Sequence, residues 1–172
     1  MKRYLLFVLA SLMLVSLTAG CGGGTKKVTL PPGVNGDIAV LFLGADTTGL
    51  TDDQIKLLQS HLTHMDKKLI EGLNSSGFTA GKIKNAKDFK GKGHLLKVSI
   101  TKHKIVPNGA RIAAGMMAGA DILTAQYELN DTTGKTVLSW EETQASARSV
   151  YYCAKSLNRS TINKIASYLG GS

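Results

Sequence analysis

The sequence is poor in aromatic and acidic residues, and after its N-terminus it has no long hydrophobic run. Aromatic residues make up 6% of the 172 residues, and 12 acidic residues stand against 21 lysines and arginines. Without a long apolar run, no membrane-spanning helix is expected after the N-terminal segment. Aromatic residues are nearly absent among the basic ones, and we therefore expect no nucleic-acid partner. A hydrophobic content of 43% and a charged content of 19% favour a globular fold over disorder.

The sequence also lacks the motifs that identify common enzyme classes. No G-x-S-x-G motif and no cysteine–histidine arrangement is present. Glu141 and Glu142 are neighbours on a predicted strand, and their side chains would point to opposite faces. Residues 133–136 resemble the end of a phosphate-binding loop, but Leu129 stands where that loop needs a glycine. We therefore expect a protein that is not an enzyme and needs no cofactor.

Two histidines raise the question of a metal ion. His61 and His64 stand three residues apart on a predicted helix, a spacing that can bring two imidazoles to one metal. A site needs a third ligand, and neither His94 nor His103 has a spacing that designates one. Polar residues at the border of an apolar stripe are ordinary, and we expect no metal site.

The first 20 residues are typical of a bacterial lipoprotein signal peptide. Lys2 and Arg3 form a basic start, residues 5–17 form a short apolar core, and small residues lead up to Cys21. The resemblance implies that residues 1–20 are removed and that Cys21 carries a diacylglyceryl thioether, with a third acyl chain on its amine. The alternative is an ordinary signal peptide cut nearby, with Cys21 incidental.

The residues after Cys21 bear on where the protein is anchored. Within residues 21–36, three glycines follow Cys21 and two prolines come later, as expected of a flexible tether that enters the fold. Two or more acyl chains give stable membrane anchoring. No aspartate follows Cys21, which favours the outer membrane, with the protein facing the periplasm.

Only one other cysteine remains for a disulfide. If Cys21 is lipidated, Cys153 has no cysteine partner in its own chain. A buried, inert thiol is one interpretation, and an intermolecular disulfide is the other.

Local signals place two helices. Thr51 and Gln54 form the pattern of a capping box, and apolar residues then recur at steps of three and four up to Leu73. This helix is expected to end at residues 74–77. A second helix is predicted over residues 153–169.

Alternating apolar residues and turn signals place the strands. Residues 37–46 are a nearly continuous apolar run, typical of a strand buried on both faces. Residues 131–134 are a turn signal that predicts a hairpin. The predicted strands are residues 37–46, 78–84, 94–106, 122–130 and 135–146. Together with the two helices they indicate a single small α+β domain over residues 37–169, with a largely antiparallel sheet, a long N-terminal helix and a C-terminal helix.

Basic residues gather in one stretch. Between Gly72 and Ala120 the only acid is Asp88. A solvated surface is the plain interpretation, and a patch for anionic lipid, glycan or another acidic polymer is the functional one. The candidate anion-binding residues are Lys82, Lys84, Lys87, Lys90, Lys92, Lys102, Lys104 and Arg111.

Residues 111–120 are small or apolar apart from the arginine. Gly115 and Gly119 have the G-x-x-x-G spacing that lets two backbones approach closely. We consider a connector that packs against the sheet or starts the next strand, and a mobile apolar loop that contacts lipid, a ligand or another subunit. In the second case Gly115, Met116, Met117 and Gly119 would form an interface, together with Cys153.

The segment from Gly109 to Glu141 resembles a known family. It has Arg111 before a glycine-rich stretch, then an alternating strand, then Asp131, Gly134 and Lys135 before a returning strand. This order is similar to that of bacterial lipoproteins known as domain of unknown function 4410. The family has no established catalytic or binding residues, so the resemblance implies a fold and an anchored layout without assigning a site.

Three functions fit these expectations. The first is a non-enzymatic lipoprotein of the cell envelope that binds a partner protein or helps an assembly. The second is a subunit of an oligomeric outer-membrane export complex. The third is a binder of anionic lipid or glycan through the lysine-rich stretch.

Overall fold

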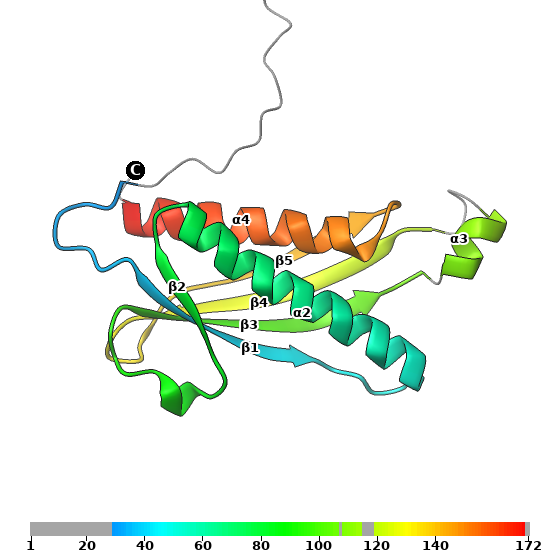
Figure 1. Ribbon diagram of the computed structural model, residues 1–172, viewed down its shortest axis with the longest axis horizontal. Helices are drawn as coiled ribbons and strands as arrows, with labels where there is room; N and C mark the ends of the chain where they lie inside the picture. Colours follow the sequence, from blue (N-terminus) through cyan, green and yellow to red (C-terminus); the bar gives the residue numbers. More distant parts are fainter. Residues whose placement is uncertain (1–28, 107, 115–118, 171–172) are drawn as a thin grey trace, which may run out of the picture.

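A five-stranded sheet runs through the part of the chain that the computed structural model describes, residues 29–106, 108–114 and 119–170 (Figure 1). A 3-10 turn at Ala86–Asp88 lies in the connection between the second and third strands. The elements in chain order are β1 (Asp37–Ala45), α2 (Asp52–Ser75), β2 (Thr79–Ile83), β3 (His94–Lys104), α3 (Asn108–Ala114), β4 (Asp121–Asn130), β5 (Thr136–Ser146) and α4 (Val150–Gly170).

The strands are ordered β2-β1-β3-β4-β5 across the sheet. β1 pairs in parallel with β2 and with β3, whereas β3–β4 and β4–β5 are antiparallel. Most paired positions belong to the antiparallel ladders, and the predicted α+β class with a largely antiparallel sheet is confirmed. The parallel arrangement of β1 and β2 is a feature that the sequence signals did not indicate.

The start of α2 follows from its first residues. The backbone N–H of Gln54 donates to Oγ1 of Thr51 at 3.4 Å, and the backbone N–H of Thr51 donates to Oε1 of Gln54 at 2.9 Å. This is the predicted capping box, and it satisfies donors that a helix end otherwise leaves open. The helix ends before Gly77, whose φ of 100° few other residues adopt.

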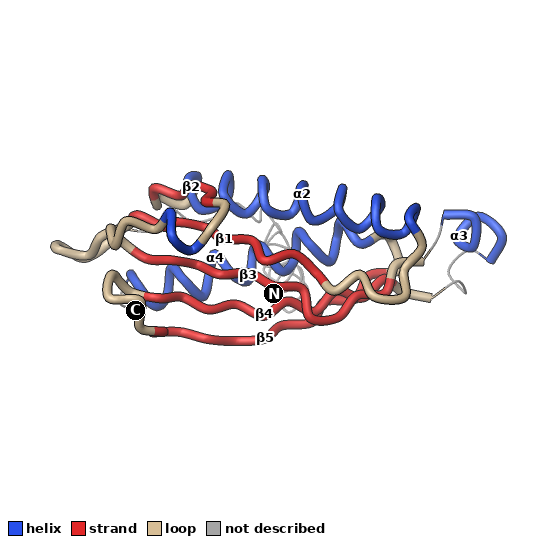
Figure 2. The backbone as a smooth tube through the Cα atoms, turned by 90° about the horizontal axis from the view of Figure 1, so that it is seen from below, coloured by secondary structure: helices blue, strands red, loops and turns tan. Residues whose placement is uncertain are grey.

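Both long helices cover the same face of the sheet, and Figures 1 and 2 show α2 and α4 on one side of it. Leu58, Leu69 and Leu73 of α2 are at most 1% exposed, and burying such a side chain contributes about 1.5–3 kcal/mol. The strands contribute an alternating set to the same core. Its fully buried members on the strands are Ile38, Val40, Leu96, Val98, Leu123, Ala125, Tyr127 and Leu129.

The β4–β5 hairpin is built as predicted. Asp131 accepts from the backbone N–H of Thr133 and of Lys135, and Gly134 takes a φ of 84°. Tyr127 and Trp140 are cross-strand partners whose rings stack with centroids 4.9 Å apart. Burial raises the pKa of the Tyr127 hydroxyl.

Residues 108–114 differ from a connector packed on the sheet, which is one of the two expectations for residues 111–120. Residues 108–114 form the short helix α3, and Figure 1 places it beyond the end of the strands. Ile112 is 87% exposed, so this helix does not bury its apolar side chain in the core. Residues 107 and 115–118 lie outside the described part of the chain.

The predicted signal peptide, residues 1–20, and the first half of the predicted tether, residues 21–28, lie outside the described residues, which begin at 29. Within the described ranges, every helix is too short or too polar to cross a lipid bilayer.

Candidate functional site

The neighbouring carboxylates Glu141 and Glu142 of β5 have different hydrogen-bond partners. Oε2 of Glu142 accepts from the Ser160 hydroxyl of α4 at 2.7 Å. Oε2 of Glu141 accepts from the Thr101 hydroxyl of β3 at 3.2 Å, on the opposite face. The two carboxylates therefore point apart, as the strand geometry predicts. In the ranges 29–106, 108–114 and 119–170, no group of three or more His, Cys, Asp or Glu residues could hold a metal ion.

The lysine-rich stretch is divided between the two ends of β3. Lys84, Lys87, Lys90 and Lys92 are exposed in the connection that precedes β3. Lys102 and Lys104 lie at its other end, next to α3, and a strand of this length separates the two groups by about 30 Å. Lys82 on β2 forms an ion pair with the buried Asp66 of α2. The structure thus does not gather the candidate lysines into one patch. The side chain of Arg111 is not among the described ones.

The proposed interface residues are only partly described. Gly115, Met116, Met117 and Cys21, the predicted lipidation site, lie outside the described residues. Gly119 takes a φ of 90°, which suits a turn between α3 and β4. Cys153 is 1% exposed, and its Sγ donates to the backbone carbonyl of Asp121 at 3.6 Å. For Cys153 to form an intermolecular disulfide, α4 would have to move off the sheet.

The two edges of the sheet differ in length. β5 has 11 residues and, among the described residues, pairs with β4 alone, whereas the opposite edge strand β2 has five. Ser139, Glu141 and Ala145 of β5 are exposed. In Figure 2 the long helices lie behind the sheet, and no helix of the described residues lies beside the outer edge of β5. β5 is therefore a long edge strand.

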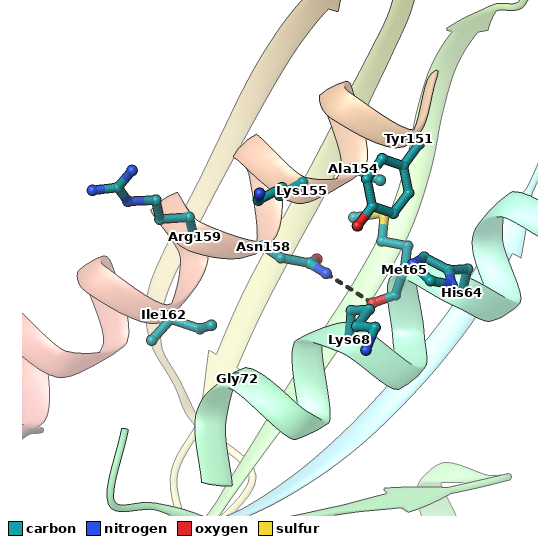
Figure 3. Close-up of a pocket in the computed structure, with 10 residues that line it drawn as sticks. All are labelled: His64, Met65, Lys68, Gly72, Tyr151, Ala154, Lys155, Asn158, Arg159 and Ile162. Atoms are coloured by element: carbon teal, nitrogen blue, oxygen red, sulfur yellow. Dashed lines mark hydrogen bonds between the residues drawn. The ribbon is translucent and has the colours of Figure 1, made fainter. Parts of the chain in front are cut away.

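A groove of about 490 Å³ lies between α2 and α4. Figure 3 shows these two helices as its walls. At one end the helices approach closely, because a Cβ on Gly72 would lie 2.5 Å from Cδ1 of Ile162. At the other end the rings of His64 and Tyr151 have centroids 5.1 Å apart.

Two side chains of this groove carry buried polar atoms that are not paired. Asn158 is 4% exposed, and its Nδ2 donates to the backbone carbonyl of Met65 at 2.8 Å (Figure 3). Oδ1 of Asn158 and Nε2 of His64 have no hydrogen-bond partner among the described residues. Buried polar atoms in native proteins are nearly always paired, so these two call for a ligand or a water.

Basic side chains surround the groove. Lys68 lies on the α2 side and Lys155 and Arg159 lie on the α4 side, and no carboxylate is among the lining residues (Figure 3). Lys68 donates to Glu71 at 2.7 Å, and this contact raises the pKa of Lys68. The described residues offer no ion pair to Lys155 or Arg159.

Sequence reasoning did not single out this groove. His64 drew attention only as a metal ligand together with His61, because the helix that completes the groove lies almost 90 residues further along the chain. One signal was available in Asn158, which interrupts an apolar helical stripe next to Leu157 and Ile162. A polar residue inside such a stripe has to find a partner when it is buried.

Comparison with known proteins identifies a family and a shared fold. The model of the family described as Domain of unknown function (DUF4410) matches residues 45–148. A search of curated proteins found no match.

Among solved structures, the chain is similar to PelC from Paraburkholderia phytofirmans, described as a dodecamer. A point variant of that protein has 19% identity and a TM-score of 0.51, over 87% of this chain and 100% of the other. A second PelC dodecamer has 17% identity and a TM-score of 0.50, over 86% and 96% of the two chains. At these identities the likeness shows the fold.

Proposed function

The chain belongs to the family described as Domain of unknown function (DUF4410), and we propose that it is a non-enzymatic assembly component of the cell envelope that works as a homo-oligomer. The observation that carries this proposal is the 11-residue edge strand β5 at the open side of the sheet. An edge strand offers a row of unpaired backbone donors and acceptors to another chain. The two PelC structures with this fold, both described as dodecamers, support self-association.

Anchoring is the second element of the proposal. Residues 1–21 have the pattern of a lipoprotein signal, and a lipid on Cys21 would hold the protein at the outer membrane, facing the periplasm. A tethered population in one membrane has a higher effective concentration than a free one, which favours assembly of identical subunits. An oligomeric outer-membrane export complex is one setting in which such a subunit would act.

The test is the native mass of the full lipidated chain extracted in mild detergent. We expect a discrete oligomer. Replacing Ser139 and Ala145 of β5 with lysine should lower the mass to that of the monomer, because like charges would meet at the shared edge. Thr79→Lys on the short edge strand β2 is the matched control and should leave the oligomer intact. A wild-type chain that stays monomeric at every concentration contradicts the proposal.

A second candidate function is binding of anionic lipid or glycan. The observation in its favour is the exposed group Lys84, Lys87, Lys90 and Lys92 before β3, where Asp88 is the only acid. We expect retention of the detergent-solubilised chain on immobilised heparin, and weaker retention as salt is raised. Changing these four lysines to glutamate should abolish retention, whereas Lys102→Glu with Lys104→Glu at the far end of β3 should not. Retention that ignores salt excludes this function.

A further inference from the structure

The groove between α2 and α4 has the dimensions and the lining of a small-molecule site. Its volume of about 490 Å³ falls within the roughly 300–1,000 Å³ typical of ligand pockets. Met65, Ala154 and Ile162 supply apolar contacts, and the Tyr151 ring, 40% exposed, supplies a flat wall. Such a surface suits a ligand with an apolar or ring-shaped body.

The polar atoms of the groove restrict the ligand further. Oδ1 of Asn158 is a carbonyl oxygen and can only accept a hydrogen bond, and the bond from Nδ2 to the Met65 carbonyl fixes which end of the amide is the oxygen. A ligand that satisfies Oδ1 therefore has to bring a donor, such as a hydroxyl. Nε2 of His64 can take either role, depending on the tautomer of the ring.

The basic side chains of the groove favour a negatively charged ligand. Lys155 and Arg159 are exposed at the rim together with Lys68, which is paired with Glu71, and no carboxylate is among the described residues that line the groove. Figure 3 shows the Arg159 guanidinium turned outward along α4, and its long side chain can swing toward the groove. Charge-assisted hydrogen bonds to a phosphate or carboxylate are stronger than neutral ones, so an anionic group would be held at this rim.

We propose that this groove binds a small hydroxylated organic anion, with the anionic group at the basic rim and a hydroxyl donating to Oδ1 of Asn158. Two sources carry that chemistry, the sugar acid of a glycan and the glycerol phosphate of a lipid headgroup. The proposal is independent of self-association, because the groove lies on the helical layer and the β5 edge belongs to the sheet.

The experiment titrates the full chain in detergent with glucuronate and with glycerol 3-phosphate, and with glucose and glycerol as their uncharged counterparts. Binding is measured by calorimetry, and the ring proton signals of the histidines report the site by NMR. We expect saturable binding of at least one anion, with His64 signals that move and signals of His103, at the far end of β3, that do not. Binding of glucuronate alone supports the glycan source, and binding of glycerol 3-phosphate alone supports the lipid source.

Variants on α4 separate the groove from general surface charge. Lys155→Glu with Arg159→Glu changes two exposed side chains and should weaken binding by about tenfold or more. Lys164→Glu, an exposed residue on the same helix outside the groove, is the control and should leave binding unchanged. The proposal is overturned if neither anion binds, if the double variant binds as tightly as the wild type, or if the control loses binding equally.

Discussion

The two halves of the sheet are joined in different ways. β3, β4 and β5 form an antiparallel half, in which a tight turn at residues 131–135 connects β4 to β5. β2, β1 and β3 form a parallel half, in which α2 carries the chain from β1 to β2. The connection from β2 to β3 then has to bring the chain back past β1, because all three strands run in the same direction.

This difference separates local from long-range determinants of the fold. In the antiparallel half, the turn residues specify the pairing over a few positions of the sequence. In the parallel half, the pairing depends on contacts between segments tens of residues apart, such as the pairing of Ile38 in β1 with His94 in β3. The parallel half should therefore be the more sensitive of the two to single substitutions at its junctions.

A pair of glycines gives the largest expected contrast. Gly93, just before β3, has a φ of 74°, and a Cβ there would lie 2.1 Å from the carbonyl oxygen of Asp37. Gly134 in the hairpin turn has a φ of 84° with nothing within 4 Å of a Cβ. Gly93→Ala should lower the free energy of unfolding by about 3 kcal/mol or more. The start of β1 has to shift, and alanine is also strained in the left-handed backbone conformation. Gly134→Ala should lower the free energy of unfolding by about 1 kcal/mol, because only the backbone strain of alanine at positive φ applies there.

Urea unfolding of both glycine variants measures this contrast. The shift in the urea midpoint gives the loss of stability, provided that the dependence of the free energy on urea concentration is unchanged. Equal losses in the two variants would mean that the Gly93–Asp37 contact does not restrict the junction of β1 and β3.

Two ion pairs give a smaller contrast between the halves. In the parallel half, Asp66 is 3% exposed and accepts from Lys82. In the antiparallel half, Lys97 and Glu128 form a cross-strand pair at 3.3 Å, and both remain partly exposed. Lys82→Ala should lower the free energy of unfolding by about 1–3 kcal/mol, because it leaves a buried carboxylate without its partner. Glu128→Ala should change it by about 0–1 kcal/mol.

The double variant Lys82→Ala with Asp66→Asn tests the cause assigned to the first loss. It should recover part of the stability in thermal or urea unfolding, because the buried group is then neutral. A double variant less stable than Lys82→Ala would show that the carboxylate has a second stabilising role.

The elements that the sequence predicted are those with local signals. The capping box at Thr51 identified the start of α2, and the turn at residues 131–134 identified the hairpin. The order of strands across the sheet has no such signal, because β1 lies between two strands that follow it in the chain. The helix α3 was missed for a related reason. Residues 108–114 contain two residue types, glycine and asparagine, that disfavour helices, and this helix buries no stripe that periodicity could reveal.

The candidate sites divide in the same way. The lysine-rich stretch is continuous in the sequence. It contains the extended strand β3, which places the lysines before the strand far from those at its end. The groove residues are scattered over α2 and α4 in the sequence, and only helix packing brings His64 to Tyr151 and Asn158 to Met65. Prediction from a single sequence finds charge that is continuous along the chain more readily than a site that two distant helices assemble.

The two halves should also differ in the pH at which each loses stability. Burial lowers the pKa of His94, which begins β3 beside β1. In the unfolded chain a histidine has a pKa of about 6.5, so unfolding takes up a proton as the pH falls below that value. The stability from the neutral ring is therefore complete above about pH 6.5 and is lost as the pH falls toward the lowered folded pKa. His61, whose pKa burial also lowers, contributes in the same window.

In the hairpin, the Thr133 hydroxyl lowers the pKa of Asp131 from its ordinary value of 3.8. The stability that this carboxylate contributes is present above the pKa of Asp131 in the unfolded chain. It is lost only as the pH falls through the lower pKa of Asp131 in the folded protein. Urea unfolding between pH 7 and 3 should therefore show a first loss below about pH 6.5. His94→Gln should reduce this first slope, leaving the part due to His61, whereas Asp131→Asn should flatten the curve only at the acidic end. Asp131 raises the pKa of His94 and so opposes the effect of burial. If Asp131→Asn instead makes the loss between pH 7 and 5 larger, the charge of Asp131 acts on His94 across the two halves, and they titrate as one coupled unit.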